Sequence, residues 1–322
     1  MDQEPDRLHE TGLIGSLRWW YEVLVRGLGG RACDPTVHGV RCPDQNGRHC
    51  VVCELFGCTG WARKFRLMVL DENGEVIQKQ IQAGQTFILR FIPLRPIAPE
   101  EWCLLDATLR LIADYGAMGG KTVFKPSDES GRENAPHHRD FGLITVEEQP
   151  GGVDCTRKTA EAYVRLSRWR RNFEDSAFSW ASLQNFWCVK GRYLKRQDPN
   201  QSSFNKLVGR NERKHCKACN QVHSPEQKCP KTGKHPRRYS DDNPGNPIDA
   251  WLAGRQQESK KVFSFKHPAE NGRTFGFVKP GLVDFNEIKR RLGQVWSGFN
   301  PDAEFQTGQQ ILNQLFHRRA QP

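Results

Sequence analysis

The order of helical and strand-like patterns in the first 150 residues most constrains the fold of this chain. Two segments have apolar residues at three- and four-residue spacing, which predicts helices: residues 11–28 and 99–115. Four segments have strand patterns: residues 65–70, 75–82, 86–94 and 141–147. The Asn-Gly pair at the end of residues 71–74 is typical of a hairpin turn. The predicted order is therefore helix, loop, strands, helix, loop and strand.

This order corresponds to a ferredoxin-like β-α-β-β-α-β domain without its first strand. Ten mostly polar residues, 1–10, stand where that strand would be. A sheet with an unfilled central position would leave backbone groups unpaired. We therefore expect the start of the chain to be truncated, or another segment to supply the strand. The predicted fold class is α+β.

The composition shifts after Pro150-Gly151-Gly152, which predicts two domains, residues 1–150 and 151–322. The second half has helical patterns and one hairpin pattern, and it fits loosely a degenerate second copy of the same α+β plan. Its predicted elements are a basic helix over 159–173, strands over 261–266 and 273–278, and helices over 285–296 and 311–316. We expect a Cys-rich insertion at 33–60 and a Cys/His-rich insertion at 211–240.

The chain is basic, with 48 Lys and Arg against 37 Asp and Glu and a formal net charge of +11. This excess favours polyanionic partners, because each phosphate neutralised by a basic side chain releases condensed counterions. A basic protein without a nucleic-acid role is the plainer alternative. No apolar run approaches the roughly 18 residues of a membrane span, and the polar N-terminus is not a secretory signal. We therefore expect a cytoplasmic protein with no membrane partner.

Two groups of cysteine and histidine have spacings that suggest structural zinc. The first is C-x7-C-x2-C-x4-C, and the second is C-x2-C-x3-H-x5-C, which approximates a zinc knuckle. The first group is Cys42, Cys50, Cys53 and Cys58, with Cys33 as a possible substitute. The second group is Cys216, Cys219, His223 and Cys229, with His215 and His235 nearby. Reduced thiols in loops are the alternative for both. Four protein ligands would leave no open position for water, so a catalytic role is not implied.

A glycine-rich loop, Gly116 to Thr122, superficially resembles a nucleotide-binding P-loop. Tyr115 occupies the position of that motif's first glycine, and the loop follows a helix instead of a strand. We therefore expect no bound nucleotide. Glycines let a backbone approach a phosphate closely, and nearby Lys121, Thr122 and Lys125 add charge and a hydroxyl, which suits an RNA backbone. The alternative is a helix C-cap and turn.

Three long motifs in the first half, together with the glycine loop, carry a resemblance to a known family. They are TGLIGSLRWWYEVLVRGLGG at 11–30, ACDPT at 32–36, ELFGCTGWARKFRL at 54–67 and YGAMGGKT at 115–122. The sequence resembles subunit one of the type III-B (Cmr-type) CRISPR effector complexes, within the RAMP superfamily. The resemblance covers residues 11–147 and is vague beyond about 160.

The resemblance implies two ferredoxin-like (RRM-like) RAMP domains and a non-catalytic, RNA-binding subunit of an antiviral ribonucleoprotein. It implies contacts with the crRNA 3′ region, with target RNA and with neighbouring RAMP subunits. It also implies candidate RNA contacts at Arg18, Arg63, Lys64, Arg66, Met118, Gly119, Gly120 and Lys121. Thr122 and Lys125 extend that loop, and Arg26, like Arg18, lies off the apolar stripe of its helix.

Two other functions remain open from the residues. One is a RAMP endoribonuclease that uses His137 or His138 with Lys121, because histidine titrates near neutral pH. No nucleophile or carboxylate pair is obviously arranged with these histidines in the sequence, so we do not predict an enzyme. The other is a zinc-ribbon scaffold without direct RNA contact.

Overall fold

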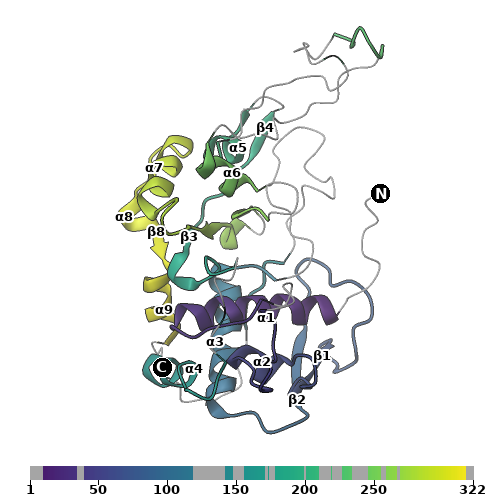
Figure 1. The fold of residues 1–322 in the computed structure, drawn as a ribbon. Helices are drawn as coiled ribbons and strands as arrows, with labels where there is room; N and C mark the ends of the chain where they lie inside the picture. The colour runs from purple at the N-terminus through teal and green to yellow at the C-terminus, as the bar shows by residue number, and fades with distance from the viewer. Residues whose placement is uncertain are drawn as a thin grey trace. The chain divides into compact units, whose positions relative to one another are not determined.

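The computed structural model has an α+β architecture with small sheets (Figure 1). It describes the chain in separate stretches. They are residues 10–34, 40–118, 142–147, 156–170, 173, 178–198, 201–209, 219, 227–233, 246–254, 259–266 and 269–316. The chain divides into two compact units. Unit 1 contains residues 1–122, 141–186 and 306–322, and unit 2 contains 123–140 and 187–305. Each unit is assembled from separate stretches, so neither is one continuous half of the sequence.

Two long helices, α1 (Glu10–Gly27) and α3 (Pro99–Tyr115), pack against each other in unit 1. Both predictions of helix are confirmed. The apolar stripe of α1 is buried from Leu17 onward, and the chain leaves the helix through Gly29 at a φ of 83°. Pro99 begins α3, and the carboxylate of Glu101 accepts a hydrogen bond of 2.8 Å from the backbone N–H of Ala98, which caps the first turn.

The small sheet of unit 1 pairs β1 (Phe65–Leu70) with β2 (Ile88–Pro93) in antiparallel register. Both strands were predicted. Residues 75–82, which we expected to be the partner of β1, pair with the end of that strand: Leu70 and Val76 form an isolated bridge, and the N–H of Ile77 donates 2.9 Å to the carbonyl of Val69. The polar side chains of this segment are mostly exposed, whereas β2 supplies half-buried Leu89 and Phe91. The more apolar segment therefore pairs with β1 along its whole length, whereas residues 75–82 begin the predicted hairpin with β1 but form no regular strand.

Three further segments of unit 1 differ from the expectations. Residues 142–147 are described without a strand, so the predicted last strand is not present there. The basic helix is shorter than predicted: α4 runs only over Arg157–Val164, with Thr156 capping it through its hydroxyl. A short helix that was not predicted, α2 (Val51–Phe56), lies inside the Cys-rich segment.

Unit 1 also takes in the last described helix of the chain. This helix is α9 (Gly308–Phe316), and it contacts α1, α3, α4 and the 3-10 helix η2 (Leu183–Asn185). A guanidinium of α3, from Arg110, donates 2.7 Å to the carbonyl of Leu315. The C-terminal helix was expected in a second domain, but its apolar face is buried in the first unit.

The larger sheet has four strands in the order β6-β7-β3-β8, and unit 2 contains β6, β7, all but the first residue of β3 and the first residue of β8. Its strands are β3 (Phe186–Lys190), β6 (Val262–Phe265), β7 (Arg273–Phe277) and β8 (Phe305–Thr307). The predicted hairpin is confirmed, since β6 and β7 pair antiparallel. The other elements are β4 (Arg196–Asp198), β5 (Gln201–Ser202), α5 (Ser203–Leu207), α6 (Pro247–Ala253), η3 (Ala269–Asn271), α7 (Phe285–Val295) and α8 (Pro301–Glu304). Helix α7 is confirmed, with Ile288 and Leu292 buried.

Candidate metal centre and candidate RNA-contacting residues

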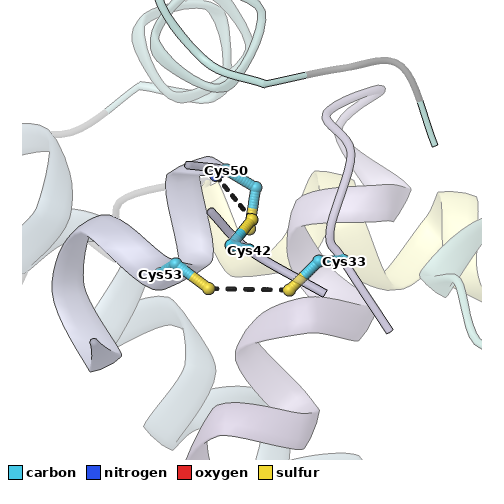
Figure 2. A group of neighbouring side chains, drawn as sticks. All are labelled: Cys33, Cys42, Cys50 and Cys53. Atoms are coloured by element: carbon cyan, nitrogen blue, oxygen red, sulfur yellow. Dashed lines mark hydrogen bonds between the residues drawn. The ribbon is translucent and has the colours of Figure 1, made fainter. Parts of the chain in front are cut away.

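Four buried cysteines converge in unit 1. They are Cys33, Cys42, Cys50 and Cys53, and their sulfur atoms all lie within 4.8 Å of one another. Figure 2 shows the four side chains pointing toward a common centre, with the sulfurs of Cys33 and Cys53 3.5 Å apart. A Zn²⁺ ion with Zn–S bonds of about 2.3 Å sets the sulfurs about 3.8 Å apart at the corners of a tetrahedron. The group therefore has the donor type, number and spacing to hold a metal ion such as zinc.

Short local structures bring these cysteines together. Cys33 lies just after the glycine turn that ends α1, and Cys42 lies in the loop before α2. Cys50 is the N-cap residue of α2 and Cys53 lies in its first turn, so this C-x2-C pair is held on one helix end. The backbone N–H of Cys50 donates 3.2 Å to the sulfur of Cys42. The loop, the helix and the end of α1 are thus joined at one point.

The fourth member of the group is Cys33, and Cys58 lies outside it. The prediction of Cys58 followed linear spacing and needs this correction. After α2 the chain turns at Gly57, with a φ of 83°, and Cys58 then forms an isolated bridge with Trp61. That turn leads the chain toward β1, while the turn after α1 returns Cys33 to the other three cysteines.

Arg18 of α1 contacts the sulfur group. Its Nη2 donates to the sulfur of Cys53 at 3.2 Å and lies 3.9 Å from that of Cys33, and its Nη1 donates 2.9 Å to the carbonyl of Gly57. Its Nε pairs with Glu22 at 3.1 Å. Burial alone would lower the pKa of Arg18, but the charges of Cys53 and Glu22 outweigh it and raise that pKa above its ordinary value.

A chain of charged groups runs from the Cys-rich segment to α3. His49 lies 2.5 Å from the carboxylate of Glu54, and the ammonium of Lys64 lies 2.5 Å from the same carboxylate. Lys64 also pairs with both oxygens of Glu101, which is fully buried. Burial would raise the pKa of Glu54, but the hydrogen bonds from His49 and Lys64 hold it at about 2. These charges stabilise one another inside unit 1.

Three of the predicted RNA contacts have internal partners that occupy them. Lys64 is 8% exposed and bound by two carboxylates, Met118 is 4% exposed, and Arg18 faces the sulfur group. The backbone N–H of Met118 donates 2.7 Å to the carbonyl of Gly142. A basic residue in the motif at 54–67 need not lie at the surface, because an ion pair can hold it inside. The side chains of these three residues are therefore little accessible to an external polyanion, and their contacts with RNA stay predictions.

The remaining described candidates differ in exposure. Arg26 is ion-paired with Glu22 and donates 3.1 Å to the carbonyl of Ala181. Arg63 is half-buried and donates 2.7 Å to the carbonyl of Phe65. Arg66 is exposed on β1. Among the candidates in the part of the chain that the structure describes, Arg66 is thus the most accessible to an external polyanion.

The first residues of the glycine loop continue directly from α3. Gly116 closes the helix with hydrogen bonds to Leu111 and Ile112, as the helix-cap alternative predicted. The ring of Trp20 packs against this turn, and its N–H donates 2.8 Å to the carbonyl of Ala117. The other predicted loop contacts, Gly119, Gly120, Lys121, Thr122 and Lys125, lie outside the described residues, as do His137 and His138.

The second predicted zinc group is described only in part. Cys219 is half-buried and Cys229 is buried, whereas Cys216 and His223 lie outside the described residues. That prediction therefore remains a prediction. Among the other cysteines, Cys103 of α3 is disulfide-bonded. Burial raises the pKa of Cys188 to about 12, so its thiol stays protonated at neutral pH.

Comparison with known families agrees with the elements of unit 1. Residues 3–124 match the family model described as RAMPs, RAMP superfamily. The matched segment contains α1, β1, β2 and α3, the central α-β-β-α of a ferredoxin-like order, together with all four clustered cysteines. The comparisons with curated proteins and with solved structures found no match.

In the described part of the chain, no helix is long and apolar enough to cross a membrane.

Sequence reasoning missed the contact between Arg18 and the cysteines. A signal was present: Arg18 and Glu22 are four residues apart in a helix whose other faces become buried, so this charged pair needed internal partners.

Proposed function

We propose that this chain is a non-catalytic, RNA-binding subunit of a type III-B CRISPR ribonucleoprotein effector. It contacts the 3′ region of the crRNA and the target RNA, and it binds neighbouring RAMP subunits. The observation that carries this proposal is the RAMP-superfamily match over residues 3–124. The net charge of +11 supports a polyanionic partner. The assignment to type III-B and the absence of catalysis rest on the resemblance of residues 11–147.

The outer face of the β1–β2 sheet is the described surface that suits RNA best. Residues directly opposite each other in an antiparallel pair share a face, and the register pairs Arg66 with Ile92 and Met68 with Arg90. Both arginines are exposed, and Ile92 is 36% exposed. Two guanidiniums beside apolar side chains can contact phosphates and cover a base or ribose. Such contacts recognise the sugar-phosphate backbone and the shape of the RNA, whereas base pairing between guide and target recognises the sequence.

Salt titration of RNA binding by the full chain tests this proposal. Arg66→Glu and Arg90→Glu, and Lys121→Glu in the glycine loop, each weaken binding of guide RNA. Each reduces the slope of log K against log salt by about 0.7, the value expected for one phosphate contact with a single strand. Lys79→Glu, at another exposed position of unit 1, is the control for the change in net charge. Unchanged affinity and slope for all three variants would contradict the proposal.

The same preparation separates binding from cleavage. Labelled repeat RNA incubated with the chain, with and without EDTA, is expected to remain intact. Specific cleavage that disappears in His138→Ala would instead establish the endoribonuclease alternative. Wild-type levels of RNA binding with intact RNA, together with co-purification of neighbouring RAMP subunits, are the results expected of a structural subunit.

A further inference from the structure

We infer that Cys33, Cys42, Cys50 and Cys53 form a tetrathiolate zinc centre and that Arg18 is its positioning residue, which offsets the charge of the thiolates through N–H···S hydrogen bonds. This inference is independent of RNA binding. The four sulfurs come from the end of α1, the following loop and α2. Arg18 reaches them from the middle of α1.

The spacing of the sulfurs favours a single ion. An iron–sulfur cluster places inorganic sulfides and several irons between its cysteine ligands, which requires more room than one ion. Sulfurs that all lie within 4.8 Å of one another already approach the edge length of a tetrahedron around one metal. Tetrahedral coordination by four thiolates is typical of structural zinc. When Zn²⁺ binds, each thiol releases its proton to solvent and forms one Zn–S bond.

The charge of the bound state explains the position of Arg18. One Zn²⁺ and four thiolates carry a net charge of −2, and this group is buried. An uncompensated buried charge is costly, and hydrogen bonds to it are stabilising. Arg18 supplies a cation 3.2 Å from the sulfur of Cys53, and the N–H of Cys50 supplies a second donor, to Cys42. Groups around metal ligands orient them and tune the metal in the same way elsewhere.

The ion pairs of α1 hold Arg18 in place. Glu22 accepts from Arg18 on one side and pairs with Arg26 at 3.4 Å on the other. Arg26 therefore shares the helix, the charge and the carboxylate partner of Arg18. Arg26 also donates 3.1 Å to the carbonyl of Ala181, and among the described residues it contacts no sulfur. A variant of Arg26 therefore removes an ion pair of α1 without touching the sulfurs, whereas a variant of Arg18 removes both the ion pair and the hydrogen bonds to the sulfurs.

Metal analysis of the full chain tests the ligands. Cys33→Ser is expected to lose one zinc per chain relative to wild type, and Cys58→Ser to lose none. The difference between variants isolates this centre from any zinc held by the second Cys/His group. If Cys58→Ser loses the zinc and Cys33→Ser keeps it, or if the wild type holds iron in place of zinc, the assignment is overturned.

Alkylation of the wild-type chain covers the case in which Cys33→Ser does not fold. Zinc-loaded protein is treated with a thiol reagent, and each cysteine is then followed by peptide mass spectrometry. The four ligands are expected to react only after a chelator is added, while Cys58 reacts in both states. Protection of Cys58 by zinc, with Cys33 reactive throughout, would contradict the ligand set.

Arg18 is tested by zinc affinity and by the spectrum of a cobalt-substituted protein. Arg18→Met is expected to weaken zinc binding by about 10- to 100-fold, the usual effect of removing a group that supports a metal ligand. It also moves the sulfur-to-cobalt charge-transfer band to lower energy, because a thiolate without its N–H donor gives up an electron more easily. Arg18→Lys recovers part of both effects, and Arg26→Met leaves both near wild type. Equal effects of Arg18→Met and Arg26→Met would show that Arg18 only supports the helix.

Discussion

At the scale of single residues, Gly57 has a conformation and surroundings that exclude a side chain. Its φ of 83° is in the region that favours glycine. A Cβ placed there would lie 2.8 Å from the backbone N of Arg63 and 2.8 Å from the carbonyl of Trp61. The carbonyl of Gly57 also accepts from Arg18. A glycine at this position of the motif at 54–67 is therefore required by the fold, which the linear motif does not show.

The first prediction concerns this glycine. Gly57→Ala is expected to destabilise the chain by about 2–4 kcal/mol, through backbone strain and the overlap with backbone atoms. Gly60→Ala is the control, because Gly60 also has a positive φ, 75°, but has open space around its Cβ position. Its cost is expected to be the strain alone, about 1–2 kcal/mol. Urea unfolding measures both, and equal costs would contradict the argument from close approach.

Lys64 supports a second prediction. Lys64→Met leaves the carboxylates of Glu54 and Glu101 without their shared cation, and Glu101 has no access to water. The expected loss of stability is about 3–5 kcal/mol, as for other buried ion pairs that lose one partner. Lys79→Met, at an exposed position, is expected to change the free energy of unfolding by less than about 0.5 kcal/mol. Comparable unfolding of the two variants in denaturant would show that the ion pairs contribute little.

At the scale of elements, helix α7 joins the helices of unit 2 through one buried guanidinium. Arg291 lies 2.7 Å from the carboxylate of Asp249 in α6, and it donates 3.0 Å to the carbonyl of Leu207 at the end of α5. It also pairs with Glu287 at 2.6 Å within α7. Hydrogen bonds from Arg290 and then Arg291 overcome a smaller effect of burial and hold the pKa of Glu287 at about 2. The carboxylate is therefore more stable in the folded chain than in the unfolded one.

The third prediction is the pH dependence of this contribution. Because the folded pKa of Glu287 lies below its unfolded value of about 4.3, its stabilising effect is complete above that pH and is lost as the pH falls toward 2. The Glu287→Gln variant lacks it at every pH. The difference in unfolding free energy between wild type and variant is expected to be about 1 kcal/mol at pH 7, reduced by solvent screening, and close to zero near pH 2. A difference that stays constant from pH 7 to pH 2.5 would contradict the assignment.

At the scale of the whole molecule, the cysteine group is the point where distant parts of unit 1 depend on one another. Arg170, beyond α4, donates 2.6 Å to the carbonyl of Arg41 in the Cys-rich loop, and its backbone N–H donates 2.9 Å to the carbonyl of His49. Helix α2 has only six residues, too few to be stable without tertiary contacts. The order of this region should therefore follow the occupancy of the metal centre.

The fourth prediction follows from that dependence. Chelation of zinc is expected to raise amide hydrogen exchange over residues 50–56, because the loss of four Zn–S bonds releases α2 from the end of α1. The Cys33→Ser variant should already exchange faster there and show little further response to the chelator. If the wild type shows no change in exchange, or if Cys33→Ser responds as the wild type does, the metal centre does not hold this segment.

The sequence by itself determined the helices α1, α3 and α7, the strands β1 and β2, and the β6–β7 hairpin, because their periodicity and turn residues are local signals. It also determined the basic charge and the Cys-rich segment. Only the tertiary structure decided that β2 pairs with β1 along its whole length while residues 75–82 pair only with its end, that Cys33 and not Cys58 completes the group, and that Lys64 and Arg18 face inward. These outcomes depend on which segments distant in the sequence bury more apolar surface and on which charged side chains find a partner in the interior. The local sequence does not indicate either, because both are set by contacts between residues far apart in the chain.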